Sequence, residues 1–281
     1  MTSQNTLEMM ARLGHAARGV VYCLVGGLAV LAAVGSGGET GGSSNALRTL
    51  LAQPFGRVLL GLIAIGFLCF SAWRFVEAIT DADRRGSEWK GLAIRGGHLV
   101  GGIIALGLAA SAGGLALGSG GRGGDDSAAR DWTAWLMAQP LGPWLVGLVG
   151  IGVAGAGIAF AVKAWRGKVT EHLVCSRDVA RWAVPMGRLG FAARGVVFLV
   201  IGGFLVAAAL HSRASEARGL GGALEALAAQ PLGWILLGVT AAGLFAFGAF
   251  SMVEAVYRRI DAPDLDEAGG AIADGVRNLG A

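Results

Sequence analysis

The residues best suited to chemistry are six charged side chains that recur in a sequence otherwise poor in charge. They form two sets: arginines that precede an apolar segment and are followed by glycine, and residues that end an apolar segment and are followed by alanine. The first set is Arg18, Arg95 and Arg194, and the second set is Glu77, Lys163 and Glu254. Ionisable residues in membrane segments are functional candidates by default, although near helix ends long side chains reach the interface at low cost. The two sets therefore predict either a structural clamp that also sets topology or an inner gate or anion site.

The spacing of these charges predicts ion pairs within each helical hairpin. Glu77 lies 23 residues after Pro54, which is about 35 Å along an α-helix, so we expect Glu77 and Arg18 at the same membrane face. The expected pairs are Arg18 with Glu77 and Arg194 with Glu254. The second repeat breaks this rule, because Lys163 stands opposite Arg95. Uncompensated positive charge there makes an anionic lipid headgroup a reasonable partner.

The sequence carries no catalytic or metal-binding signature, so we expect no enzyme, no cofactor and no metal. Gly118, Gly120 and Gly123 match the spacing of a dinucleotide-binding loop, but an apolar helix precedes them instead of a strand, and no βαβ unit follows. Asp125 and Asp126 are adjacent, which alone makes no metal site or acid–base pair. The 4 histidines stand singly, as solvated or interfacial histidines do.

Long apolar segments carry these charges. The chain has 281 residues, of which 54% are hydrophobic and 15% charged, against about 25% charged residues in a soluble domain. The apolar residues gather in six blocks, at 19–35, 55–77, 96–117, 141–163, 195–211 and 232–255. Each block is about long enough to cross a hydrocarbon core of roughly 30 Å. We expect the blocks to be helices, which satisfy their backbone hydrogen bonds internally in lipid.

Three copies of one unit organise the segments, at residues 11–80, 90–170 and 187–260. Each copy is expected to hold a first helix, a glycine- and serine-rich outer loop, a short interfacial helix, an Ala-Gln-Pro element and a second helix. Proline suits the first position of a helix, where its missing N–H would be unpaired anyway. The glutamine is expected to bond the freed backbone groups. These helix-break residues are Gln53, Pro54, Gln139, Pro140, Gln230 and Pro231.

Charge distribution and repeat order predict the topology. We assign 17 of the 23 basic residues to one side, which the positive-inside rule makes cytoplasmic. The net charge of +4 is attributed to the same rule and not to a nucleic-acid surface. Both termini, including a polar tail at 261–281, are then cytoplasmic. Because every repeat enters with the same orientation, the copies are parallel, and a pseudo-threefold axis is the natural packing. We therefore predict an all-α integral membrane six-helix bundle, with residues 1–281 forming a single membrane domain.

Glycine-rich helix faces predict where the helices touch. The chain has 49 glycines, and small residues let helix backbones approach closely in a bilayer. Residues four apart share one helix face. The expected packing seams are Gly97 with Gly101, Gly155 with Ala159, and Gly238 with Ala242.

Two motifs carry a resemblance to a known bacterial family. Residues 12–21 and 188–197 both read Arg-Leu-Gly-x-Ala-Ala-Arg-Gly-Val-Val, and three Ala-Gln-Pro-x-Gly elements accompany them. Over residues 11–260 the chain resembles the family named domain of unknown function 1206, which has three tandem two-helix repeats in one membrane protein. The second repeat departs from the pattern at Ile94-Arg95-Gly96-Gly97-His98. The resemblance implies a bacterial plasma-membrane protein and supplies no activity, substrate or catalytic residue.

These features predict an uncharacterised multi-pass plasma-membrane protein, non-enzymatic, with a structural, lipid-interacting or partner-binding role. Its partners are the lipid bilayer and anionic lipids at the cytoplasmic face, and not nucleic acid. The alternative is a small-solute transporter or channel along the pseudo-threefold axis, which a hydrated path at repeat-equivalent positions would distinguish. A membrane enzyme would need clustered acid–base or metal residues, which the sequence does not show.

Overall fold

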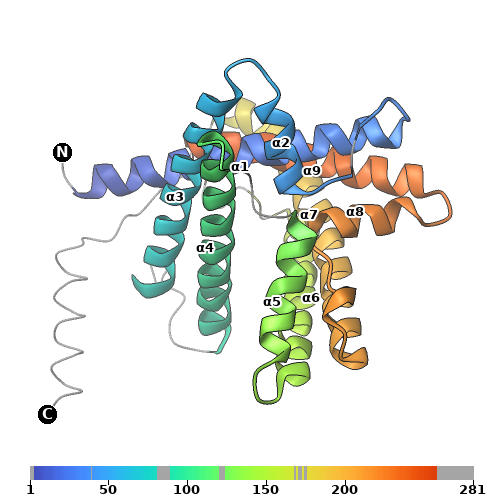
Figure 1. Ribbon diagram of the computed structural model, residues 1–281. Helices are drawn as coiled ribbons and strands as arrows, with labels where there is room; N and C mark the ends of the chain where they lie inside the picture. Colours follow the sequence, from blue (N-terminus) through green and yellow to red (C-terminus); the bar gives the residue numbers. More distant parts are fainter. Residues whose placement is uncertain are drawn as a thin grey trace, which may run out of the picture.

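The computed structural model describes residues 3–38, 40–80, 89–119, 124–167, 169, 173 and 176–257, and over these residues the protein is all-α (Figure 1). The predicted tail at 261–281 lies outside the described residues. The long helices are α1 (Ser3–Ala33), α3 (Gly56–Thr80), α4 (Trp89–Ala116), α6 (Gly142–Arg166), α7 (Arg177–His211) and α9 (Gly233–Tyr257). The short helices are α2 (Ser43–Leu51), α5 (Asp125–Met137) and α8 (Leu220–Ala228), and a 3-10 turn, η1 (Ala214–Glu216), precedes α8.

The six long helices are each long and apolar enough to cross a membrane, from Glu8–Ala33 to Gly233–Tyr257. Large apolar side chains cover much of their outer surface, for example Leu62 at 61% exposure, Leu148 at 68% and Val239 at 68%. Soluble monomers rarely expose such extended apolar surface. The structure therefore confirms the six predicted apolar helices and indicates a membrane protein.

The Ala-Gln-Pro element forms a β-turn between a short helix and a long one. In the first repeat the N–H of Gly56 donates to the carbonyl of Gln53 at 2.9 Å, with Pro54 second in the turn and Phe55 in the left-handed region at φ 60°. The residues equivalent to Phe55 are Leu141 and Leu232, at φ 61° and 60°. A Cβ on Gly56 would lie 2.4 Å from a carbonyl oxygen of α2, so the turn requires glycine there. The long helices thus begin two residues after each proline instead of at it.

Two aspartates of α5 hold the three short helices together. Asp125 accepts hydrogen bonds from the backbone N–H of Ser44 at 3.0 Å and from its hydroxyl at 2.5 Å, at the start of α2. Asp126 accepts from the N–H groups of Gly219 at 2.7 Å and Gly222 at 3.0 Å, at the start of α8. A carboxylate is favourable at a helix N-terminus, where N–H groups lack intrahelical partners. One dipeptide therefore caps two helices from other repeats.

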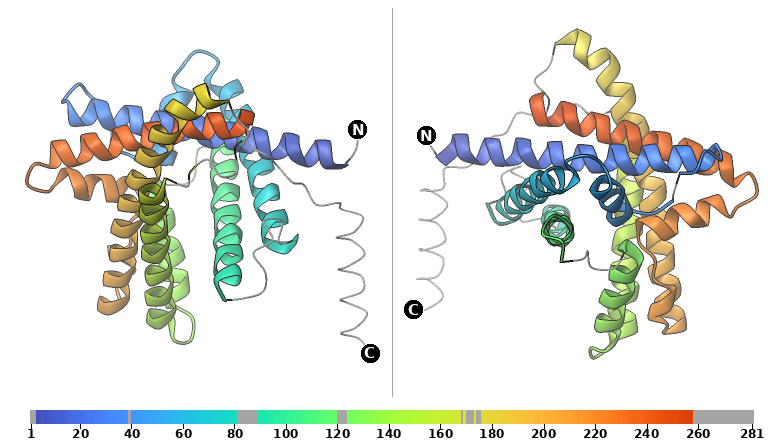
Figure 2. Two further views of the ribbon diagram at one scale, coloured as in Figure 1. Left: turned by 180° about the vertical axis from the view of Figure 1, so that it is seen from behind. Right: turned by 45° about the horizontal axis from the view of Figure 1, so that its top comes forward.

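The long helices pack mainly between repeats. The most extensive contacts join α3 to α4, α6 to α7 and α9 to α1. Each pair joins the second helix of one repeat to the first helix of another, and the contact of α9 with α1 joins the third repeat to the first. The α1/α9 pair crosses the α3/α4 pair, so the long helices do not share one direction (Figures 1 and 2). The all-α prediction is confirmed, whereas a compact bundle about a pseudo-threefold axis is not.

Glycines make the closest approaches between helices. A Cβ on Gly26 of α1 would lie 2.4 Å from the backbone nitrogen of Phe245, and one on Gly248 of α9 would lie 2.5 Å from that of Cys23. Of the three predicted packing seams, the one at Gly238 lies against a neighbouring helix in the described part of the chain, and the ones at Gly97 and Gly155 do not. A Cβ on Gly238 makes an ordinary contact with α1 at 3.6 Å. No described atom lies within 4 Å of a Cβ on Gly97, Gly101 or Gly155.

Candidate functional site

Three arginines on the first helices bind the C-terminal ends of neighbouring second helices. Arg95 of α4 donates from Nε to the carbonyl of Ala78 at 2.6 Å and from Nη2 to that of Ile79 at 3.1 Å, near the end of α3. The other two are Arg12, which binds the carbonyls of Ala255 (3.1 Å) and Val256 in α9, and Arg188, which binds those of Ala164 (3.0 Å) and Trp165 (3.5 Å) in α6. The last carbonyls of a helix lack intrahelical partners, and positive charge is favourable beside them. These capping arginines therefore fix the register between repeats.

The caps correct the predicted alignment of the second repeat. Arg95 is equivalent to the other two capping arginines, and not to Arg18 and Arg194. Arg18 and Arg194 each lie 6 residues after a capping arginine, and the same offset from Arg95 reaches Gly101. The predicted alignment of Arg95 with Arg18 and Arg194 depends on only two residues, an arginine followed by a glycine. The second repeat therefore has no cation where the first and third have one.

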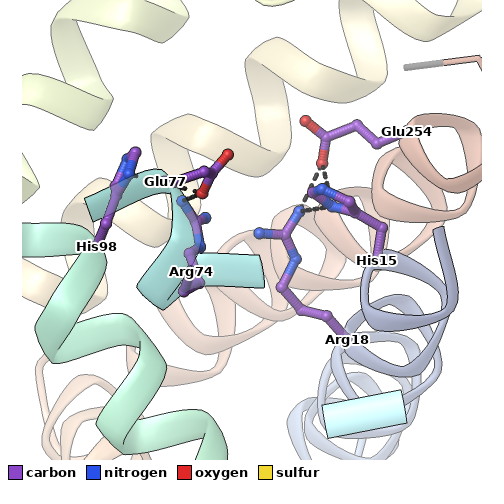
Figure 3. Close-up of polar contacts among 6 residues, drawn as sticks. All are labelled: His15, Arg18, Arg74, Glu77, His98 and Glu254. Carbon is purple, nitrogen blue, oxygen red and sulfur yellow. Dashed lines mark hydrogen bonds and ion pairs between the residues drawn. The ribbon is translucent and has the colours of Figure 1, made fainter. Parts of the chain in front are cut away.

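Arg18 forms a buried ion pair between the first and the last long helices, α1 and α9. Its Nη2 donates to Oε2 of Glu254 at 2.5 Å and to Nδ1 of His15 at 3.0 Å (Figure 3). Arg18 is 7% exposed and His15 is fully buried. The predicted pairing of Arg18 with Glu77 is wrong, because α1 packs most extensively on α9 and so meets the carboxylate of the third repeat.

The α3/α4 interface repeats the contact between a carboxylate and a histidine. Oε2 of Glu77 lies 2.9 Å from Nη1 of Arg74 and 3.6 Å from Nδ1 of His98 on α4 (Figure 3). Glu77 is 2% exposed. His98 is equivalent to His15, since each lies 3 residues after a capping arginine. Two interfaces thus set a largely buried carboxylate against a histidine.

The α6/α7 interface places cations against aromatic rings instead. Lys163 occupies the position of the two glutamates, and its Nζ lies 4.2 Å from the ring centroid of Phe191, which occupies the position of the two histidines. The guanidinium of Arg194 lies 4.8 to 5.6 Å from four ring centroids, and it forms no ion pair with any carboxylate in the described ranges. The predicted pair with Glu254 is therefore not formed. The four rings are those of Tyr22, Phe160, Phe198 and Phe247.

Two phenylalanines join these interfaces into one cluster. The ring of Phe70 lies 4.9 Å from the guanidinium carbon of Arg74 and 5.2 Å from that of Arg18. The ring of Phe247 lies 5.1 Å from Arg18 and 4.8 Å from Arg194. Each contact of this kind is worth about 0.5–2 kcal/mol. The central charge cluster is defined as His15, Arg18, Arg74, Glu77, His98, Lys163, Arg194 and Glu254.

Among its own eight residues the central charge cluster holds more cations than carboxylates, and two of its guanidinium groups have a buried N–H donor without an acceptor. With neutral histidines it holds 4 cations and 2 carboxylates. Nε of Arg18, Nε of Arg194 and Oγ of Ser251 are buried without a hydrogen-bond partner. A buried group left in this way costs about 1–3 kcal/mol. Guanidinium donors match the oxygens of phosphate and carboxylate, so the arrangement is suited to an anion.

The predicted site residues divide into three places. Those that meet in the central charge cluster are Arg18, Glu77, Lys163, Arg194 and Glu254. Arg95 caps α3 instead. The helix-break residues lie just before α3, α6 and α9, at the opposite ends of these helices from the charge cluster. In α3, for example, Gly56 precedes Glu77 by 21 residues, or about 32 Å of helix. Gln139 and Gln230 donate to carbonyls one turn back in α5 and α8, at 3.4 and 3.3 Å.

Three residues of the cluster are absent from the predicted site. His15 and His98 carry a signal in the sequence, because each follows a glycine at the same offset from a capping arginine. Arg74 carries none, since Phe160 and Ser251 stand at its position in the other repeats. No group of three or more His, Cys, Asp and Glu side chains that could hold a metal occurs within the part of the chain that the structure describes.

Comparison with known proteins supports the same register. A family described as Domain of Unknown Function (DUF1206) matches residues 13–81, 96–167 and 189–258, and each match begins one residue after a capping arginine. An uncharacterized protein of Bacillus subtilis (strain 168), YxxB, is 32% identical over 263 residues, covering 90% of this chain and 92% of that relative. No solved structure matches the chain. Three family matches over most of the chain, in register with the caps, place this protein in the DUF1206 family.

Proposed function

We propose that this is a non-enzymatic protein of the bacterial plasma membrane that binds the phosphate headgroup of an anionic lipid at the central charge cluster. Both termini are cytoplasmic in this proposal, and neither a cofactor nor nucleic acid takes part. The observation that carries it is Arg194, which is surrounded by four aromatic rings and has no carboxylate partner among the described residues.

A lipid phosphate bound beside Arg194 would supply a negative charge and hydrogen-bond acceptors for its guanidinium group. Burying a charge is costly unless it is paired and hydrogen-bonded. Phosphate oxygens accept short, strong hydrogen bonds from guanidinium groups. Lys163 and Arg194 both contact Phe191 or its neighbour Phe160, so two cations lie at the α6/α7 interface. Anionic lipids at the cytoplasmic leaflet attract such groups.

The test compares lipid retention by the wild type and Arg194→Gln. Each protein is purified from bilayers of phosphatidylcholine and phosphatidylglycerol, and its bound lipids are counted by native mass spectrometry. We expect the wild type to prefer phosphatidylglycerol by about tenfold, which corresponds to about 1.4 kcal/mol, and Arg194→Gln to lose that preference. Arg130→Gln, which removes an exposed cation of α5, is the matched control. Equal preference in the wild type and Arg194→Gln would overturn the proposal.

A small-solute transporter is the second candidate, and the two carboxylate–histidine contacts favour it. Nδ1 of His15 lies 3.5 Å from Glu254, and Nδ1 of His98 lies 3.6 Å from Glu77. Histidine is the side chain that most often serves as a proton shuttle. Proteoliposomes with a trapped pH indicator test this function. Proton flux that His15→Gln abolishes would favour transport, and an absence of flux would leave lipid binding as the stronger proposal.

A further inference from the structure

A cavity of about 510 Å³ lies where short helices of all three repeats meet. The starts of α2 and α8 are in contact there, since a Cβ on Gly221 would lie 3.0 Å from the backbone nitrogen of Gly42. Gly124, just before α5, lines the cavity from the second repeat, and Ala32 lines it from the end of α1. Ala32 follows Arg18 by 14 residues, or about 21 Å of helix. This junction cavity, as it is called below, is therefore separate from the central charge cluster.

Two opposite charges line the junction cavity from equivalent positions of two repeats. Arg48 of α2 and Glu225 of α8 each lie 6 residues before the proline of the following helix-break turn. Arg48 forms no ion pair within the described part of the chain. Glu225 is paired through Oε2 with Arg218 at 3.3 Å, and both of these side chains are largely exposed. An exposed pair contributes less than about 1 kcal/mol, so a bound cation can take the place of Arg218.

The two aspartates that line the cavity are already engaged in the fold. Oδ2 of Asp125 accepts a hydrogen bond from the N–H of Ser43 at 2.6 Å, and its Oδ1 accepts two from Ser44. Asp126 accepts from two N–H groups at the start of α8. The positive end of a helix offsets the charge of each of these carboxylates. The charges that remain for a ligand are therefore one guanidinium, Arg48, and one carboxylate, Glu225.

The rest of the cavity wall is polar or lacks side chains. Thr40 and Asn45 contribute a hydroxyl and an amide, several glycines contribute backbone, and Ala32 has the one apolar side chain among the described residues of the wall. Small-molecule sites have volumes of about 300–1,000 Å³ and are usually lined by hydrophobic side chains. The junction cavity has a suitable volume but a polar wall. It therefore suits a small ligand with little apolar surface.

We propose that the junction cavity binds a small zwitterion, a molecule with one carboxylate and one ammonium group such as a small amino acid or a short peptide. Arg48 binds the carboxylate, because the paired donors of a guanidinium match its two oxygens. Glu225 binds the ammonium group. A simple anion would lie near the carboxylate of Glu225, and a simple cation near the guanidinium of Arg48, so each would be repelled by one of the two. This site does not depend on the proposed binding of a lipid headgroup.

Binding to the full-length protein in detergent micelles tests the proposal, by equilibrium dialysis of radiolabelled ligands. The zwitterions are glycine, 4-aminobutyrate and diglycine, whose charged groups differ in separation. We expect at least one of them to bind with a Kd of about 1 mM or below. Butylamine and butyrate each carry only one of the two charged groups, and we expect both to bind at least about tenfold more weakly.

Two variants assign the charged groups of the ligand to the two side chains. We expect Arg48→Gln to lower the affinity for the zwitterion by about tenfold while leaving that for butylamine unchanged or higher. Glu225→Gln should likewise lower the affinity for the zwitterion, without lowering that for butyrate. The matched controls are Arg57→Gln and Asp131→Asn, which remove exposed charges that do not line the cavity, and both should bind as the wild type does.

Three results would overturn the proposal. The first is that none of the three zwitterions binds. The second is binding that neither Arg48→Gln nor Glu225→Gln weakens, because the ligand would then lie elsewhere on the protein. The third is butylamine binding as tightly as the best zwitterion, which would show that Arg48 recognises no carboxylate.

Discussion

Replacing Glu254 with glutamine removes the carboxylate that pairs with Arg18. Nη2 of Arg18 and Oε2 of Glu254 are 2.5 Å apart, and the two side chains are only 8% and 12% exposed. Removing one partner of a buried ion pair costs about 3–5 kcal/mol, because the remaining charge stays buried. Glutamine still offers Arg18 an acceptor oxygen, so we expect the lower end of that range, about 3 kcal/mol, or about a hundredfold in the folding equilibrium.

The loss is measured as the free energy of unfolding in mixed micelles, by titration with dodecyl sulfate and tryptophan fluorescence. Glu225→Gln is the matched control, since Arg218 and Glu225 form a 3.3 Å pair whose side chains are 42% and 57% exposed. An exposed pair contributes less than about 1 kcal/mol. Equal losses for the two variants would refute the reasoning, because Arg18 would then not depend on Glu254 for its charge balance.

Exchanging charges between two residues tests which carboxylate forms the ion pair with Arg18. Arg18→Glu with Glu254→Arg restores opposite charges across the α1/α9 interface, and we expect it to recover much of the stability that either single change loses. Arg18→Glu with Glu77→Arg is expected to be additive or worse, since these two residues form no ion pair in the structure. Recovery of stability in the second combination instead of the first would show that Arg18 pairs with Glu77 inside the first hairpin, and would contradict its pairing with Glu254.

Three further changes test the caps and the glycine contacts. Asp125→Asn weakens the cap on α2, which should cost about 1 kcal/mol and speed amide hydrogen exchange in α2 while leaving α9 protected. Gly248→Ala forces apart the backbones of α9 and α1, because its Cβ would lie 2.5 Å from a backbone nitrogen, whereas Gly61→Ala enters open space and should be neutral or stabilising in the same unfolding assay. Arg95→Gln loses its bonds to two carbonyls at the end of α3 and should cost about 1.5–3 kcal/mol.

The spans and repeats could be predicted because their signals are local. A span needs only a long apolar run, and the Ala-Gln-Pro-x-Gly element recurs without a gap. The start of the second helix is harder to predict, because proline suits both the first helical turn and the second position of a β-turn. The final glycine of the element distinguishes the two, since the N–H of Gly56 closes the turn on Gln53.

The partners within the charge cluster could not be predicted from depth in the membrane. Arg18 is expected at the same face as the ends of all the second helices, so depth alone does not choose between Glu77 and Glu254. The choice depends on which helix packs on α1, and that is a property of the whole fold. The position of Arg95 could have been found, because Gly97 and His98 follow it as Gly14 and His15 follow the first capping arginine.

The contact between α9 and α1 places the charge cluster where the first and third repeats meet. Arg18 and Glu254 are 236 residues apart in sequence, whereas Glu77 and His98 are 21 residues apart. Closing the longer loop costs more entropy, although the cost grows only with the logarithm of its length. The Arg12 cap and the Arg18 ion pair stabilise that junction. The donors of Arg18 and Arg194 gather around Phe247 only after the first and third repeats have packed, so an anion bound there would stabilise the assembled chain over its separate repeats.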